Sequence, residues 1–361
     1  MAGIGTGPRQ SKIEGQTPRL GLPYRYDGLQ QNLKSVALGG MNLKFGKNLS
    51  LAATMALGIV TSMPAVAAQL GGDARAVIPK DVQQLIVVDY RAMQNSDAAM
   101  NLKARVLPPE LKQLETALKS SGLNDNHDVD ELAFAAFRTA NGSESTKIVG
   151  IAQGQFSLQD LLANFKKQKV KATKIRTNII YPMGSSGMLV SFLNPTTMVF
   201  GSSDAIKYAL DARDGLIPSF LGNDTMMQQM SLVDTEPIWS ILDQKGTQMM
   251  MRGVLGEASQ LADYDTVKKR LNTSRYTMNF NNGVKFNLDV VTPDTFTAAT
   301  MSSLLNAAAM YKKVSGTAAE KAAIDNTTID SNAGTLQVRF ASSDSQFATL
   351  LQSPLFQSVV H

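Results

Sequence analysis

The chain has 361 residues, with 35 Lys and Arg against 30 Asp and Glu, a formal net charge of +5, and no cysteine. The absence of cysteine excludes disulfides, thiol nucleophiles, thiolate metal sites and a lipid-anchoring cysteine. The first 67 residues hold seven cations and two acids, which leaves 28 of each sign among the remaining 294 residues. The net charge therefore gives no reason to expect a nucleic-acid partner.

Residues 41–67 have the pattern of a cleavable signal peptide. Lys44 and Lys47 precede a short apolar run over residues 49–63, and Ala65-Val66-Ala67 follows the helix-breaking Pro64. A retained membrane anchor needs about 20 predominantly apolar residues, more than this run supplies. We expect cleavage after Ala67 or one residue later, and a periplasmic or secreted protein. Residues 1–40 show no periodicity and are interpreted as a mis-called start or an unusually long leader.

The segment from residue 68 to residue 217 predicts one α+β unit. In chain order we expect a strand at "QQLIVVDY" from Gln83, a helix over 97–120, and strands at "ELAFAAFRT" and from Ile148. A helix follows Ser157, a hairpin covers 177–194, and a strand from Thr197 leads into a helix at Ser203.

The segment 218–361 repeats this order. We expect a strand at "PIWSILDQ", a helix over 254–271, and two strands joined by the turn Asn281-Asn282-Gly283. A helix follows Thr292, an Ala-rich polar segment covers 316–334, and a final strand leads into a helix at Ser343.

Equivalent strand-to-helix junctions in the two segments lie at a nearly constant offset. Ser157 and Thr292 are 135 residues apart, and Ser203 and Ser343 are 140 apart. The sequence therefore predicts an α+β fold made by tandem duplication of a β-α-β-β-α-β, ferredoxin-like unit with antiparallel sheets.

The layout resembles uncharacterised exported bacterial proteins built from paired α+β, ferredoxin-like repeats. The resemblance covers most of residues 68–361 and is carried by "IPKDVQQLIVVDY", "DVDELAFAAF" and "PIWSILD". These stretches are not specific motifs, and the resemblance implies no catalytic residues.

Catalytic side chains are scarce. His127 and His361 are the two histidines, and neither is placed as the general base of a serine triad. The turn from Gly184 to Gly187 lacks the spacing of a nucleophile elbow. The acidic stretch Asn124–Glu131 fails the calcium-loop pattern, so we interpret it as a solvated loop. We expect no cofactor and no catalytic residue that the sequence can name.

Methionines supply a weak candidate for a metal site. Thioethers suit Cu(I), and Met226, Met230 and Met250 could provide three of them if the fold brought them together. The competing interpretation is that these side chains fill an apolar core.

A run of cations supplies a candidate for contact with anionic surfaces. It contains Lys166, Lys167, Lys169, Lys171, Lys174 and Arg176, with no acid between them. The first lysines complement a helix C-terminus, so the run is also compatible with an ordinary solvated surface.

These features favour an exported, non-enzymatic binding or structural protein with an unknown ligand or protein partner. The alternatives are an extracytoplasmic hydrolase that uses carboxylates brought together by the fold, and a soft-metal (copper) carrier.

Overall fold

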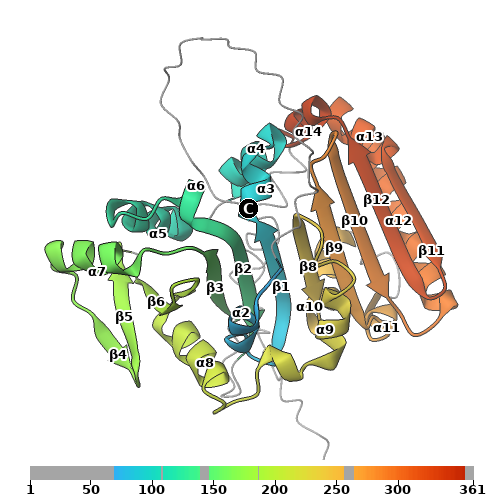
Figure 1. Ribbon diagram of the computed structural model, residues 1–361. Coiled ribbons are helices and arrows are strands. Elements are labelled where there is room, and N and C mark those ends of the chain that lie inside the picture. Colours follow the sequence, from blue (N-terminus) through green and yellow to red (C-terminus); the bar gives the residue numbers. More distant parts are fainter. Residues whose placement is uncertain (1–68, 107–108, 139–145, 186, 256–263, 354–361) are drawn as a thin grey trace, which may run out of the picture.

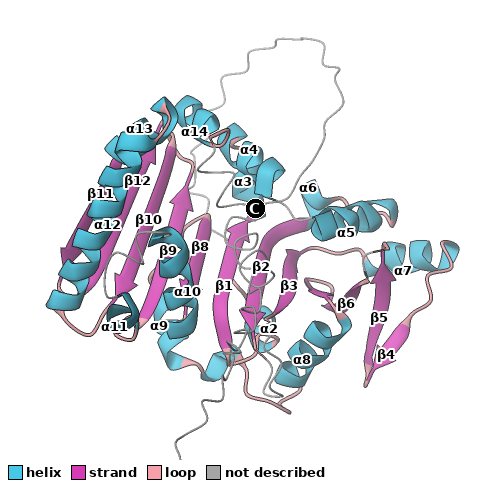
Figure 2. Cartoon of the chain, turned by 180° about the vertical axis from the view of Figure 1, so that it is seen from behind, coloured by secondary structure: helices cyan, strands magenta, loops and turns pink. Residues whose placement is uncertain are grey.

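The computed structural model describes residues 69–106, 109–138, 146–185, 187–255 and 264–353. Within these residues twelve strands form one sheet, in the order β11-β12-β10-β9-β8-β1-β2-β3-β7-β6-β5-β4. Every neighbouring pair is antiparallel. The chain is therefore an α+β protein built on a single antiparallel sheet (Figures 1 and 2).

The strands follow the expected apolar runs. Their bounds are β1 Val82–Asp89, β2 Val129–Phe137, β3 Lys147–Gly154, β4 Thr173–Ile175, β5 Asn178–Met183, β6 Met188–Asn194, β7 Thr197–Gly201, β8 Ile238–Leu242, β9 Thr273–Asn279, β10 Val284–Val291, β11 Thr327–Asn332 and β12 Thr335–Ser342.

The helices lie on both faces of the sheet. Their bounds are α2 Gly72–Ala76, α3 Tyr90–Gln94, α4 Asp97–Val106, α5 Pro109–Ser120, α6 Asp125–Asp128, α7 Leu158–Lys167, α8 Ser203–Arg213, η1 Phe220–Gly222, α9 Asp224–Met230, α10 Gln244–Leu255, α11 Tyr264–Lys268, α12 Thr295–Ser315, α13 Ala318–Asp325 and α14 Asp344–Leu350. None of these helices is both long enough and apolar enough to cross a membrane.

One face of the sheet, which we call the first face, is covered along its whole length. It carries Ile86 and Val88 of β1 and, across the ladder, Leu288 of β10, because register partners point to the same side. Helices α3, α4, α5 and α7 pack on its β1–β7 part. Helices α10, α11 and α12 pack on its β8–β12 part.

The opposite, second face is covered only over part of the sheet. Leu85, Val87 and Trp239 on this face are buried under α2, α8, η1 and α9. On β9, β10 and β12 the same face carries Arg275, Asp289 and Arg339, and Asp289 pairs with both arginines. Figure 1 shows these strands from their uncovered side, which is typical of an antiparallel sheet with one solvated face.

Most of the expected elements are confirmed, with two differences among the helices. The stretch 97–120 holds α4 and α5 rather than one helix, and Pro108 and Pro109 at the junction lack the backbone N–H that a continuous helix needs. The helix expected over 254–271 is instead α10, which starts at Gln244, and the short α11. The expected hairpin turn is confirmed, because Asn282 and Gly283 both have positive φ.

The sheet order departs from the ferredoxin-like arrangement that the sequence predicts. A split β-α-β unit would place the strands flanking the first helix parallel to each other, with another strand between them. Here β1 pairs directly with β2, and the pair is antiparallel. Pattern and element order alone do not specify which strands become neighbours, so this error could not be avoided from the sequence.

Element order is nevertheless repeated about the β1–β8 pair. Going outward from β1 the strands are β2, β3, β7 and β6, and going outward from β8 they are β9, β10, β12 and β11. Helices occur at corresponding places: α4 and α5 match α10 and α11, α7 matches α12, and α8 matches α14. The hairpin strands β4 and β5 extend the sheet beyond β6, and no corresponding described strands extend it beyond β11.

Candidate functional site: a basic projection

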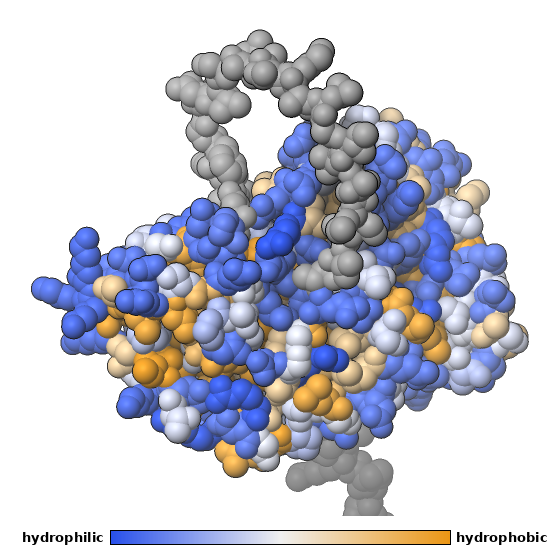
Figure 3. Space-filling model, viewed as in Figure 1, coloured by the Kyte–Doolittle hydropathy of each residue, from blue (hydrophilic) through white to orange (hydrophobic). Residues whose placement is uncertain are grey.

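Five of the six candidate cations lie together at one end of the molecule. Lys166 and Lys167 end α7, Lys169 and Lys171 lie in the following link, and Lys174 lies in β4. All five side chains are exposed, and none forms an ion pair with a residue that the structure describes. We call this group the basic projection; it is the left-hand end of Figure 1 and carries protruding hydrophilic side chains in Figure 3.

Helix α7 is fixed to the sheet by its apolar side. Leu161 and Phe165 are buried, and the rings of Phe165 and Tyr181 lie 4.8 Å apart between centroids. The amide of Asn164 donates to the carbonyl of Ser121 at 2.9 Å, which ties α7 to the end of α5. The lysines at the end of α7 therefore extend from an anchored helix.

The end of α7 forms a Schellman motif with a lysine where glycine is usual. Val170 N donates to Phe165 O at 3.0 Å, and Lys169 N donates to Lys166 O at 3.1 Å. Lys169 has a φ of 58°, in the left-handed region that favours glycine. Val170, just beyond it, packs against the apolar core, so the direction in which the lysines leave the helix is defined.

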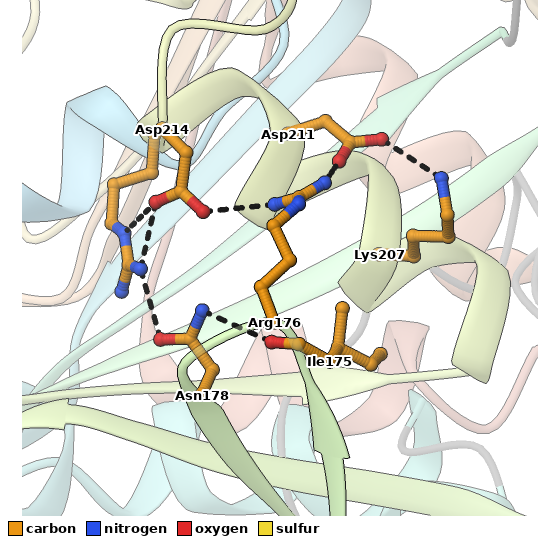
Figure 4. A network of polar contacts seen from close by, with 7 residues as sticks. Ile175, Arg176, Asn178, Lys207, Asp211 and Asp214 are labelled. Atoms are coloured by element: carbon orange, nitrogen blue, oxygen red, sulfur yellow. Dashed lines mark hydrogen bonds and ion pairs between the residues drawn. The ribbon is translucent and has the colours of Figure 1, made fainter.

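Arg176 is exposed like the five lysines but differs from them, because its guanidinium is paired with carboxylates of the same chain (Figure 4). It occupies the two-residue turn between β4 and β5, with a φ of 55°. Its guanidinium pairs with Asp211 and donates to Asp214 at 2.8 Å, both in the region of α8. Arg176 is thus a clamp between the hairpin and α8 rather than part of an open cationic surface.

The acids near the hairpin are occupied by other cations as well. Arg213 donates to Asp214 at 2.8 Å and to Asn178 at 2.9 Å, and Lys207 donates to Asp211 at 3.1 Å. Burial opposes ionisation of Asp214, but the hydrogen bonds from Arg213 and Arg176 hold its pKa below the usual value. These carboxylates are therefore already paired, and the positive charge of the basic projection is not compensated by them.

Two exposed apolar side chains accompany the lysines, and the sequence analysis did not identify them. Leu162 lies one helical turn before Lys166 and so on the same side of α7. Ile179 is the register partner of Lys174 in the β4–β5 hairpin. The signal for Ile179 was weak, because its exposure depends on β5 lying close to the edge of the sheet.

The methionine candidates do not come together. Met226 and Met230 on α9 are buried in the core of the second face, against Trp239. Met250 on α10 packs against the core of the first face, on the other side of the sheet. The three thioethers therefore do not form one metal site, and among the described residues no group of three or more His, Cys, Asp or Glu side chains is placed to hold a metal ion.

We expected the acidic stretch Asn124–Glu131 to be a solvated loop, but the structure shows otherwise for part of it. It forms the short helix α6 and the start of β2, and Asp130 pairs with Arg91. Glu131 is only 1% exposed, and neither of its carboxylate oxygens has a hydrogen-bond partner among the residues that the structure describes. Burial, and next the nearby charges of Asp89 and Asp130, raise its pKa to about 8. The sequence signal was its position at the start of the apolar run "LAFAAF".

Two cavities lie among the described residues, and each has at most one acidic residue in its lining. A cavity of about 30 Å³ lies under α5, with Glu115 as its single acidic lining residue. A cavity of about 190 Å³ lies between α13, α14 and β12, with no acid in its lining. Neither of these two cavities is lined by Glu131 or Asp89.

Comparisons with known proteins assign no family. No family model and no curated protein matches the chain. Among solved structures, crystal form I of TP0453 aligns with a TM-score of 0.42 at 11% identity over 83% of this chain and 100% of that chain. Crystal form III of TP0453 aligns with a TM-score of 0.41 at 11% identity over 77% and 96% of the two chains.

Proposed function

We propose that this is an exported, non-enzymatic binding protein that attaches to anionic phospholipid surfaces through the basic projection. One observation carries the proposal: five exposed lysines extend from an anchored helix and a clamped hairpin, while the acids beside them are already paired. The membrane surface would be bound, not crossed.

The magnitude of the effect is sufficient for reversible binding. A lysine near an anionic bilayer contributes about 1 kcal/mol, so five contribute several kcal/mol at low ionic strength. Leu162 and Ile179 favour lipid over an acidic glycan, because apolar side chains among lysines can enter the headgroup boundary. The long methylene stems of the lysines are compatible with the same interface.

The test is co-sedimentation of the protein with vesicles of phosphatidylcholine alone and of phosphatidylcholine mixed with phosphatidylglycerol. We expect binding only to the anionic vesicles, weakening as salt is added. The double variant Lys171→Gln/Lys174→Gln should lose about 2 kcal/mol, or roughly 30-fold in affinity.

A matched control removes two exposed lysines elsewhere. Lys269→Gln/Lys285→Gln changes the net charge equally but lies outside the basic projection, so it should bind as the unmodified chain does. Equal losses of vesicle affinity in the two double variants would mean that only net charge matters. That result would overturn the basic projection as the binding site. Binding to a soluble acidic polysaccharide but not to vesicles would overturn the choice of lipid.

The two alternative functions receive less support. A carboxylate hydrolase needs two acids facing one pocket, and the lining of each described cavity contains at most one. A copper carrier using Met226, Met230 and Met250 would need side chains from opposite faces of the sheet.

Export is part of the proposal, and its signal lies outside the described residues. The intact mass of the protein recovered from its host should correspond to a chain starting at Ala68 or Gln69. A mass that retains residues 1–67 would contradict export through this signal.

We also propose that the two sides of the sheet arose by duplication, with residues 68–217 and 218–361 as the repeats. The repeated order of elements about the β1–β8 pair supports this. Residues 68–217 expressed alone should then dimerise through β1, since β1 would replace the missing β8 of its neighbour. A folded but monomeric fragment would contradict that expectation.

A further inference from the structure

Helix α12 has an apolar outer side that no described residue covers. Its inner side packs on the sheet through Ala298, Met301 and Leu305. On its outer side Phe296 is 74% exposed, Met310 63% and Val314 82%. Met310 and Val314 lie 14 and 18 residues after Phe296, which places all three on one stripe of the helix. Tyr311, beside this stripe, is 66% exposed.

The stripe carries no charged side chain between Phe296 and Met310. Between Phe296 and Met310 it continues through the small residues Thr300, Ser303 and Ala307, and no residue from Thr295 to Tyr311 carries a charge. A surface helix normally presents charged or polar residues to water, and a helix that is apolar all round is normally buried. The four large side chains together expose on the order of 500 Å², with Phe296 about 21 Å along the helix from Met310.

We infer that the outer stripe of α12 binds the α12 of a second copy of this chain, in an antiparallel, two-fold symmetric dimer. An uncharged stripe offers nothing to a charged partner, but it can face its own copy without opposing like charges. Lys312 lies about 160° around the helix from Phe296, on the side of Met301 and Leu305, so the two copies of this lysine do not face each other across the stripe.

The spacing of large and small residues suits this arrangement. The register that places Phe296 opposite Val314 of the partner also places Thr300 opposite Met310 and Ser303 opposite Ala307. Large side chains thus meet smaller ones, and two small residues meet at the centre, where the helices can approach closely. A symmetric dimer uses the same patch on both copies, as this register requires.

The area predicts a weak dimer. Stable interfaces bury about 800 Å² from each partner, and the stripe offers less than that. We therefore expect a concentration-dependent equilibrium between monomer and dimer. Because α12 and the basic projection lie at opposite ends of the sheet, dimerisation would leave both projections accessible (Figures 1 and 2).

The first test is sedimentation velocity of the processed chain over a range of concentrations. We expect a shift from monomer to dimer as concentration rises. Ser303→Glu places two like charges at the centre of the interface and should weaken the dimer by at least about tenfold. Leu216→Glu changes an equally exposed apolar residue away from α12 and should leave the dimer intact.

The second test uses the absence of cysteine from the chain. A mixture of Phe296→Cys and Val314→Cys chains should form a mixed disulfide dimer on mild oxidation. Phe296→Cys alone should not, because the two copies of position 296 would be roughly 27 Å apart along antiparallel helices at about 1.5 Å per residue. As a control for folding, both cysteine variants should melt at the same temperature as the unmodified chain.

Three results would overturn the inference. These are a monomer at every concentration, cross-linking of Phe296→Cys with itself, and an undiminished dimer in Ser303→Glu. None of them bears on the lysine variants, so dimerisation and the proposed lipid binding can fail separately.

Discussion

Replacing Glu131 with glutamine should make the protein more stable at neutral pH and remove much of its pH dependence. Glu131 lies in β2, directly across the ladder from Asp89 and next to Asp130. Its two oxygens are buried, and neither has a hydrogen-bond partner within the described part of the chain. An ionised carboxylate in such a place is strongly unfavourable, so the folded protein holds a proton there.

The sign and size of the effect follow from the pKa values. The pKa of Glu131 is raised from 4.5 to about 8 in the folded protein. Between these values the folded state binds a proton that the unfolded state releases, so stability falls as pH rises. The slope is about 1.4 kcal/mol per pH unit, which gives a loss of roughly 3–4 kcal/mol from pH 5 to pH 8 as an upper estimate.

The assay is urea unfolding of the unmodified chain and of Glu131→Gln at several pH values from 5 to 8. The two chains should have similar free energies of unfolding at pH 5. Above pH 5 the unmodified chain should lose stability, so the glutamine variant should become progressively more stable than the unmodified chain. Asp330→Asn, on the edge strand β11, is the control for the loss of one exposed carboxylate. If the curves for Glu131→Gln and the unmodified chain stay parallel across this range, Glu131 does not carry the proton and the reasoning is wrong.

Three further substitutions test the local structure. Lys169→Gly should raise the free energy of unfolding by about 1 kcal/mol in urea titrations, because glycine suits the left-handed position, and yet should weaken vesicle binding. Arg176→Ala should lower the free energy of unfolding by up to about 1 kcal/mol and increase hydrogen exchange in the β4–β5 hairpin, since Asp211 and Asp214 lose their shared partner; unchanged exchange would contradict the clamp. Gly150→Ala should lower the melting temperature and cost about 1–3 kcal/mol, because a Cβ would lie 2.1 Å from the ring of Phe200.

The basic projection was only partly predictable. Six neighbouring cations without an acid between them are visible in the sequence, and all six are exposed as a solvated run should be. Arg176 could not be separated from the lysines, because its partners Asp211 and Asp214 lie more than thirty residues away and meet it only when the hairpin packs on α8.

Local patterns in the sequence determined most of the secondary structure. Apolar runs such as that of β1, the Asn282-Gly283 turn and the cap at Ser343 act over a few residues, so their signals are complete within a short window. The absence of cysteine is a property of the sequence itself and needs no tertiary information.

Only the tertiary structure decided which strands are neighbours and which side chains are buried. The pairing of β1 with β8 joins residues about 150 positions apart, and nothing local distinguishes it from other antiparallel pairings. The same holds for the burial of Glu131, the separation of the methionines on opposite faces, and the uncovered side of α12. Each depends on what packs against a residue from elsewhere in the chain, and that information is set by the whole fold.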